Sequence, residues 1–224
     1  MNLRFFNITS IILKVWMALL GAFLIIFLVI HLSINLCLLR SDGGRWFNAA
    51  AYFMGTNWVV HVLEIILFAG FIFHILLGIK LQLINWFSRP HRYYVLPKSK
   101  TPFLSKYMIY TGGIIIVFLV IHFMNFYFIR MGWVKNPSPP LDEGHPNFYV
   151  IARLLFSEPF YTSLYCIFII ILAFHLNHGF QAAFQSLGLN DKSYTPLIET
   201  IGLIYSILIP AGFIIIPLSL FFIR

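Results

Sequence analysis

The chain alternates between long apolar runs and short polar segments, and its charged residues mark where the runs end. Five long runs contain no Asp, Glu, Lys or Arg, except for Glu64 inside the second run. A helix needs roughly 20 apolar residues to cross a bilayer core about 30 Å thick, so each run holds one span. The pattern therefore predicts five transmembrane helices, near residues 12–38, 57–84, 106–130, 159–186 and 199–222.

The composition agrees with lipid rather than water as the solvent of this chain. Hydrophobic residues make up 60% and charged residues 10% of it, whereas a soluble domain is about half apolar and a quarter charged. No small-residue cleavage site follows the first run, so we expect that run to be a retained span. We therefore expect an all-α integral membrane protein, with residues 1–224 forming one domain.

The charge balance is basic, with 15 Lys and Arg against 7 Asp and Glu. In a soluble protein this excess would suggest nucleic acid as a partner. Here six basic residues and no acidic residue fall within 80–106, between the second and third runs. Basic loops remain in the cytoplasm. The sequence thus predicts an inner-membrane protein with a cytoplasmic N-terminus and an outer C-terminus.

Histidines within the apolar runs occur in repeated contexts. The pentapeptide Phe-Leu-Val-Ile-His ends at His31 in the first run and at His122 in the third. The motif Phe-His-x-x-x-Gly places His74 in the second run and His175 in the fourth. The chain therefore resembles two similar helix pairs in tandem, with one histidine on each of the first four helices.

The depths of these histidines predict two facing pairs. His31 and His122 lie in the outer halves of their spans, and His74 and His175 lie in the cytoplasmic halves, on the order of 15 Å away. Histidines can simply bond neighbouring helices, but matched depths in duplicated contexts favour haem ligation. Two neutral imidazoles hold a six-coordinate haem iron suited to electron transfer. We expect two b-type haems in a bundle of the first four helices, with the fifth helix peripheral.

Other residues near these histidines are further candidates for cofactor binding. Gly78 and Gly179 each follow a ligand by four residues, which removes a side chain where a flat macrocycle must approach. His178 lies three residues after His175 and is an alternative ligand, or a partner for a haem propionate. The glycine spacing favours His175 as the ligand.

The outer half of the second span contains a second polar cluster. Glu64 is the only carboxylate inside the first four spans, and His61 precedes it by three residues. Beside a quinone, Glu64 would exchange the protons of its reduction or oxidation; alternatively, it forms an ion pair near the membrane surface. For His61, an ion pair or a hydrogen bond near the membrane surface is favoured. Asn35, one turn after His31, could bond quinone or a propionate, although a helix contact is favoured.

Taken together, the sequence resembles the five-helix, di-haem cytochrome b anchor of succinate:quinone oxidoreductases over nearly its whole length. The resemblance implies that His74 and His175 bind the haem nearer the cytoplasmic partners, and His31 and His122 the distal haem. It also implies a flavoprotein subunit and an iron–sulfur subunit on the cytoplasmic face. Some fumarate reductases of this family carry a proton-conducting glutamate at the position of Ala173. The resemblance therefore does not imply a proton route through this position.

The expected function is electron transfer between the iron–sulfur partner and membrane quinone, with the quinone reacting on the outer side. The chain contains no flavin or nucleotide motif, so the dicarboxylate chemistry would belong to the partners. Two alternatives stay open. One is the di-haem anchor of a formate dehydrogenase or hydrogenase. The other is a non-redox five-helix transporter or scaffold.

Overall fold

The computed structural model describes residues 3–87, 107–139, 141, 145–189 and 191–222, with only the backbone for residues 3–10. Five of its helices are long and apolar enough to cross a membrane, which confirms the predicted all-α membrane class and its five spans. They are α1 (Leu3–Asn35, extended by the 3-10 helix η1, Leu36–Leu39), α3 (Trp58–Phe87), α5 (Met108–His122, continued to Arg130), α8 (Pro159–Ser186) and α9 (Thr195–Phe222).

The helix ends agree with the sequence boundaries to within a few residues, apart from the start of α1, which lies nine residues before the expected boundary. Within the basic loop, Arg89, Arg92, Lys98, Lys100 and Lys106 lie outside the described residues.

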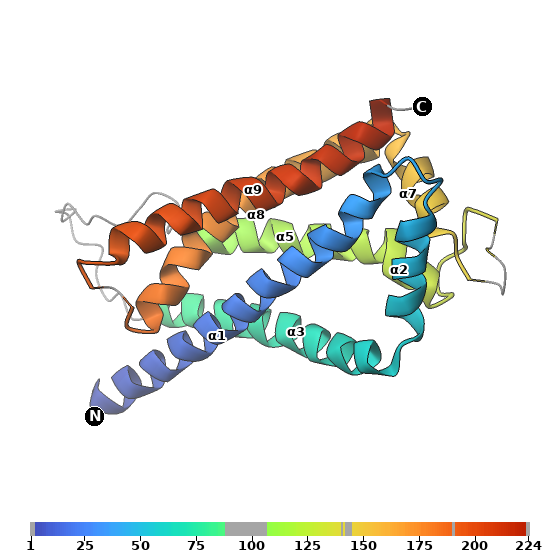
Figure 1. Ribbon diagram of the computed structural model, residues 1–224. Helices are drawn as coiled ribbons and strands as arrows, with labels where there is room; N and C mark the ends of the chain where they lie inside the picture. The colour runs from blue at the N-terminus through green and yellow to red at the C-terminus, as the bar shows by residue number, and fades with distance from the viewer. Residues whose placement is uncertain (1–2, 88–106, 140, 142–144, 190, 223–224) are drawn as a thin grey trace.

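Two further helices occupy segments that the sequence analysis left as loops. They are α2 (Arg45–Thr56) and α7 (Phe148–Phe156), and both lie at the same end of the molecule (Figure 1). The side chain of Asn48 joins them: it donates to Asn147 Oδ1 at 3.0 Å and accepts from the Tyr149 backbone N–H at 3.1 Å. Asn147 also caps α7 by accepting from the Val150 N–H.

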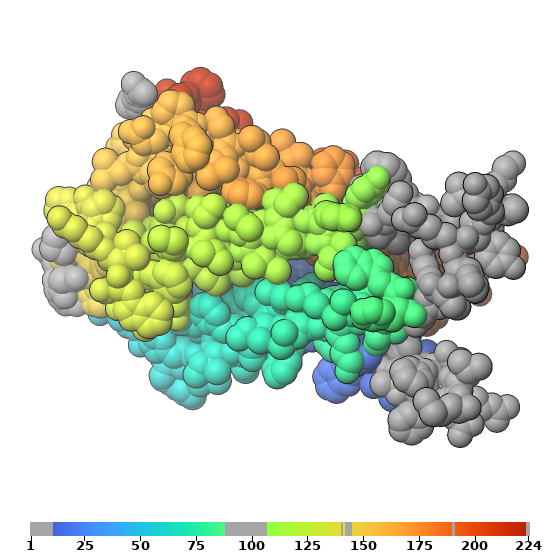
Figure 2. Space-filling model, turned by 180° about the vertical axis from the view of Figure 1, so that it is seen from behind, coloured from blue at the N-terminus to red at the C-terminus, as the bar shows by residue number. Residues whose placement is uncertain are grey.

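Four of the long helices form a closed ring in the order α1, α3, α5, α8, because each contacts the next and α8 returns to α1. Figure 2 shows one side of this ring, where α5 lies between α3 and α8. The fifth span, α9, runs along α8 and also contacts α1. Opposite corners of the ring are therefore α1 with α5, and α3 with α8.

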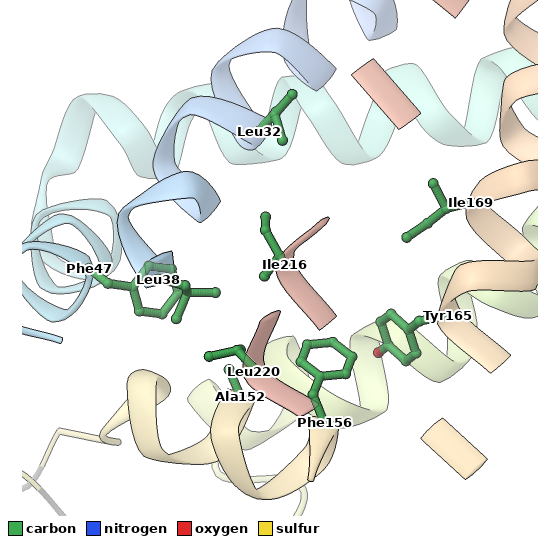
Figure 3. Close-up of a cluster of buried hydrophobic side chains, with 9 residues drawn as sticks. All are labelled: Leu32, Leu38, Phe47, Ala152, Phe156, Tyr165, Ile169, Ile216 and Leu220. Atoms are coloured by element: carbon green, nitrogen blue, oxygen red, sulfur yellow. The ribbon is translucent and has the colours of Figure 1, made fainter. Parts of the chain in front are cut away.

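The main buried cluster lies at the α2–α7 end of the ring (Figure 3). It joins α1, η1, α2, α7, α8 and α9 through Leu32, Leu38, Phe47, Ala152, Phe156, Tyr165, Ile169, Ile216 and Leu220. Away from it, many large apolar side chains are exposed, including Ile65 at 70% and Leu208 at 63%. Such surface is stable against lipid tails rather than water.

The turn before α2 provides a test of packing at this end. Gly43 and Gly44 both have left-handed backbone angles, with φ of 68° and 83°. A methyl group on Gly44 would overlap the Tyr149 side chain, whereas one on Gly43 would meet nothing within 4 Å. Gly43→Ala should cost about 1 kcal/mol for the backbone alone, and Gly44→Ala about 1–3 kcal/mol more.

The measurement is the midpoint of thermal unfolding for both variants in detergent. Equal losses of stability in the two variants would contradict the close packing of Tyr149 on this turn.

Candidate functional site

His31 and His122 meet inside the ring from its opposite corners. Their ring centroids are 5.8 Å apart and their planes cross at 89°. Phe27, one turn earlier on α1, stacks on His31 at 5.2 Å. Phe213 of α9 approaches the same imidazole to 5.7 Å, and Tyr165 of α8 lies 6.2 Å from His122. This pair is therefore enclosed by aromatic side chains from several helices.

His74 and His175 form the equivalent pair across the other diagonal, between α3 and α8. Their ring centroids are 6.5 Å apart and their planes cross at 66°. The Thr111 hydroxyl of α5 lies 3.2 Å from His175 Nδ1. The four histidines singled out by their sequence contexts are thus brought together as the two pairs expected from their depths.

Two glycines that the sequence analysis did not consider lie beside the His74–His175 pair. A Cβ atom on Gly21 of α1 would stand 3.8 Å from His74 Cε1, and one on Gly112 of α5 would stand 3.6 Å from His175 Cε1. Each glycine precedes the histidine of its own helix by ten residues. At about 1.5 Å rise per residue, the two histidine pairs are about 15 Å apart along α1 and α5. The equal spacing of ten residues on both helices was the sequence signal that could have identified these two glycines.

The donor set of each pair fits a bis-histidine haem. The ring centroids are 5.8 and 6.5 Å apart, a separation at which both imidazoles of a pair could bind one metal ion through bonds of about 2 Å. Within the described residues, no third His, Cys, Asp or Glu completes a metal cluster. Two neutral imidazoles suit an iron that carries its own four equatorial nitrogens.

Each pair also contains a buried imidazole nitrogen without a hydrogen-bond partner among the described residues. These two nitrogens are His74 Nδ1 and His122 Nδ1. A buried polar atom without a partner is costly in a protein interior. Each histidine pair thus contains one buried imidazole nitrogen that no described residue satisfies, which fits a site that holds a further group.

The remaining cofactor candidates have specific surroundings. A Cβ on Gly179 would meet nothing within 4 Å, whereas one on Gly78 would stand 3.4 Å from the terminal methyl of Met17. Asn35 Nδ2 donates to the His31 carbonyl at 2.7 Å and lies 3.4 Å from His31 Nδ1. His178 is half-buried on α8, and the ring that lies against His74 is that of His175.

A π-helical turn follows His122 directly. It is η2 (Phe123–Tyr127), where the Phe128 N–H donates to the Phe123 carbonyl five residues earlier. A π turn adds one residue to the helix, so later side chains are rotated by about 100° relative to a regular α-helix. The short helix α6 (Phe128–Arg130) then completes the span. The turn therefore sets the direction in which Tyr127 and Arg130 project.

Arg130 projects onto Glu64 of α3 and forms an ion pair with it. His61 Nδ1 lies 3.5 Å from the other Glu64 oxygen, and the Arg130 guanidinium lies 4.9 Å above the Tyr127 ring. These four side chains line a cavity of about 240 Å³, together with Phe68. Glu64 thus forms an ion pair, as in the alternative given for it from the sequence. The sequence analysis missed its partners Arg130 and Tyr127 because they lie more than 60 residues away.

The comparisons with known proteins found no match among protein-family models, curated proteins or solved structures.

The Glu64–Arg130 ion pair gives a prediction about stability. The two side chains are 16% and 24% exposed, so Arg130→Ala leaves a carboxylate partly buried and without its cation. We expect a loss of about 2 kcal/mol, below the roughly 3–5 kcal/mol found when one partner of a fully buried pair is removed. Unfolding by sodium dodecyl sulfate in mixed micelles measures this loss.

Arg40 provides the matched control, because it pairs with Asp42 at 3.4 Å but is 56% exposed. Arg40→Ala should cost less than about 1 kcal/mol. The double variant Arg130→Met with Glu64→Gln should recover most of the stability lost in Arg130→Ala. If the double variant is as unstable as Arg130→Ala, the uncompensated carboxylate is not the cause.

Proposed function

We propose that this chain is the membrane-anchor cytochrome b of a quinone-linked oxidoreductase, and that it binds two haems and one quinone. The observation that supports the proposal is the arrangement of the four histidines. They form two pairs, each spans a diagonal of the ring, and their centroid separations are 5.8 and 6.5 Å. Hydrogen bonding between neighbouring helices does not require this geometry, whereas bis-histidine ligation of two cofactors does.

In this proposal, His31 and His122 hold one haem, and His74 and His175 hold the other. Bound haem supplies reversible one-electron chemistry, and two imidazole ligands leave no open iron position for a substrate. Asn35 and Thr111 help to orient His31 and His175 through their polar groups. Gly21 and Gly112 provide space beside the His74–His175 pair.

The cavity beside Glu64 supports a quinone site near the His31–His122 pair. The π turn that begins after His122 leads directly to Tyr127 and Arg130 in the cavity wall. A quinone ring requires an apolar wall and polar groups for its two oxygens, and the cavity offers Phe68 with Glu64 and His61. Glu64 can exchange a proton with quinol, with Arg130 stabilising its ionised form.

The partners and the orientation rest on the resemblance of the sequence to succinate:quinone oxidoreductase anchors and on its charge distribution. The proposed iron–sulfur and flavoprotein subunits dock at the end nearer the His74–His175 pair, which the basic loop 80–106 marks as cytoplasmic. The α2–α7 end then faces the outer side, and the surrounding partner is membrane lipid.

Purified protein should contain two low-spin b-type haems per chain, detected by a pyridine haemochrome assay and a reduced-minus-oxidised spectrum. His31→Ala or His122→Ala should remove one haem, because a single imidazole holds six-coordinate iron poorly. His74→Ala or His175→Ala should remove the other. A protein without haem, or with mainly high-spin iron, would exclude this proposal.

Two matched pairs of variants sharpen this test. His178→Ala should keep both haems while His175→Ala loses one; the reverse result would reassign the ligand on α8. Gly112→Val adds bulk beside His175, whereas a Cβ on the adjacent Gly113 would meet nothing within 4 Å. We therefore expect Gly112→Val, and not Gly113→Val, to lower the haem content.

Glu64→Gln should reduce quinone-linked turnover by about 10²-fold or more, the usual contribution of a positioned acid or base. The amide keeps the size of the side chain but cannot exchange the proton. Both haem spectra and the activity with an artificial dye should remain unchanged.

The control for this variant is Glu158→Gln, the same substitution at an exposed carboxylate that does not line the cavity, and it should leave quinone turnover unchanged. Unchanged quinone turnover in Glu64→Gln would remove Glu64 from the mechanism while leaving the haem assignment intact.

A further inference from the structure

The Thr111 hydroxyl of α5 makes two contacts beside the His74–His175 pair. It donates to the Met108 carbonyl at 3.0 Å, and its oxygen lies 3.2 Å from His175 Nδ1. A threonine hydroxyl has a single proton to donate but can also accept, and within a helix it often bonds the carbonyl three or four residues earlier. Because the Met108 carbonyl takes the only proton of this hydroxyl, the oxygen accepts a hydrogen bond from the Nδ1–H of His175.

This contact sets the tautomer of His175. With the imidazole proton on Nδ1, Nε2 keeps its lone pair and is the nitrogen that can bind a metal. A hydroxyl that donated to Nδ1 would instead place the imidazole proton on Nε2, which could then bind no iron. The two hydrogen bonds of Thr111 therefore select the form of His175 that can act as a ligand.

The other three histidines of the two pairs lack such an acceptor within the described residues. His74 Nδ1 and His122 Nδ1 have no hydrogen-bond partner there. Asn35 Nδ2 lies 3.4 Å from His31 Nδ1 and donates to the His31 carbonyl at 2.7 Å, but an amide NH₂ group has only donors. In the part of the chain that the structure describes, His175 is thus the one imidazole of the four whose Nδ1–H meets a side-chain acceptor.

The backbone of α5 holds this acceptor close to the imidazole. A Cβ on Gly112, the residue after Thr111, would stand 3.6 Å from His175 Cε1. The threonine side chain is β-branched and therefore stiff, and its hydroxyl is tied to the Met108 carbonyl of its own helix. The distance between the hydroxyl and the imidazole is therefore fixed by α5 and α8, which contact each other along the ring.

We propose that Thr111 is a positioning residue that lowers the reduction potential of the haem held by His74 and His175. This inference rests on the proposed function. A hydrogen bond from Nδ1–H makes an imidazole a stronger electron donor to its metal, and a stronger donor stabilises ferric iron more than ferrous iron. Reduction adds one electron from the iron–sulfur partner, breaks no bond and moves no proton, since His175 keeps its Nδ1 proton in both oxidation states.

Potentiometric titration of both haems in the purified complex, followed by absorbance, tests this role. Thr111→Val keeps the shape of the side chain but removes the acceptor. The equilibrium of the His74–His175 haem should shift about threefold to tenfold toward the ferrous form, where tenfold is about 59 mV for one electron. Thr111→Ser keeps a hydroxyl and should restore the original potential. The potential of the His31–His122 haem should not move, and His31→Ala identifies that haem by removing it.

Thr200→Val is the matched control, because the exposed Thr200 hydroxyl donates to the Pro196 carbonyl of its own helix at 2.8 Å. Both potentials should be unchanged in this variant. If Thr111→Val binds too little haem, Thr111→Ala removes the acceptor without adding a methyl group, and it should raise the same potential.

An unchanged or lowered potential in the variants without the hydroxyl would contradict the inference, as would an equal rise in Thr111→Ser. Two bound haems with unmoved potentials would leave the proposed function intact. Absence of haem from the unsubstituted chain would instead refute the proposed function, and this inference with it.

Discussion

The arrangement of this protein depends on the cost of polar side chains in lipid. Inside a bilayer, an imidazole or a carboxylate is stable only if it faces the protein interior and finds a partner there. The four helices of the ring each place one histidine inward, and the histidines meet across the diagonals rather than between neighbours. Contacts between neighbouring helices hold the ring together, while the diagonal pairs lie along its interior at two depths. The ring therefore has two polar levels separated by apolar side chains.

The two halves of the chain share more than the repeated histidine motifs. On every helix of the ring, the residue ten positions before the histidine lies at the level of the other pair: Gly21, Glu64, Gly112 and Tyr165. The two glycines leave space beside His74 and His175. At the other level the repeat has diverged: Glu64 pairs with Arg130, whereas Tyr165 is buried against His122 and accepts a hydrogen bond from Asn125. Asymmetry at this level leaves one side of the ring polar and the other side tightly packed.

Sequence patterns predicted the spans and the histidine pairing because both follow from local rules. Charged residues mark span ends, and position within a helix sets depth. The sequence patterns did not predict the helices α2 and α7, because both are short. Each follows a segment rich in glycine, proline and polar residues, which is typical of loops. The π turn at Phe123–Tyr127 has no residue signature, since it consists of a change in backbone hydrogen bonding. The Glu64–Arg130 contact joins the second span to the end of the third, and its geometry depends on that turn.

The two ends of the ring therefore suit different tasks. The main buried cluster, the helices α2 and α7, and the cavity beside Glu64 all lie at one end. In the proposed function, this end would hold the Glu64 carboxylate and the quinone. If electrons enter from a partner at the opposite end while protons are exchanged at this one, turnover moves charge across the membrane. Each elementary charge moved through 100 mV corresponds to about 2.3 kcal/mol, so the membrane potential would favour one direction of the reaction. With the quinone on the outer side, quinol oxidation would conserve energy in the membrane potential, and quinone reduction would consume it.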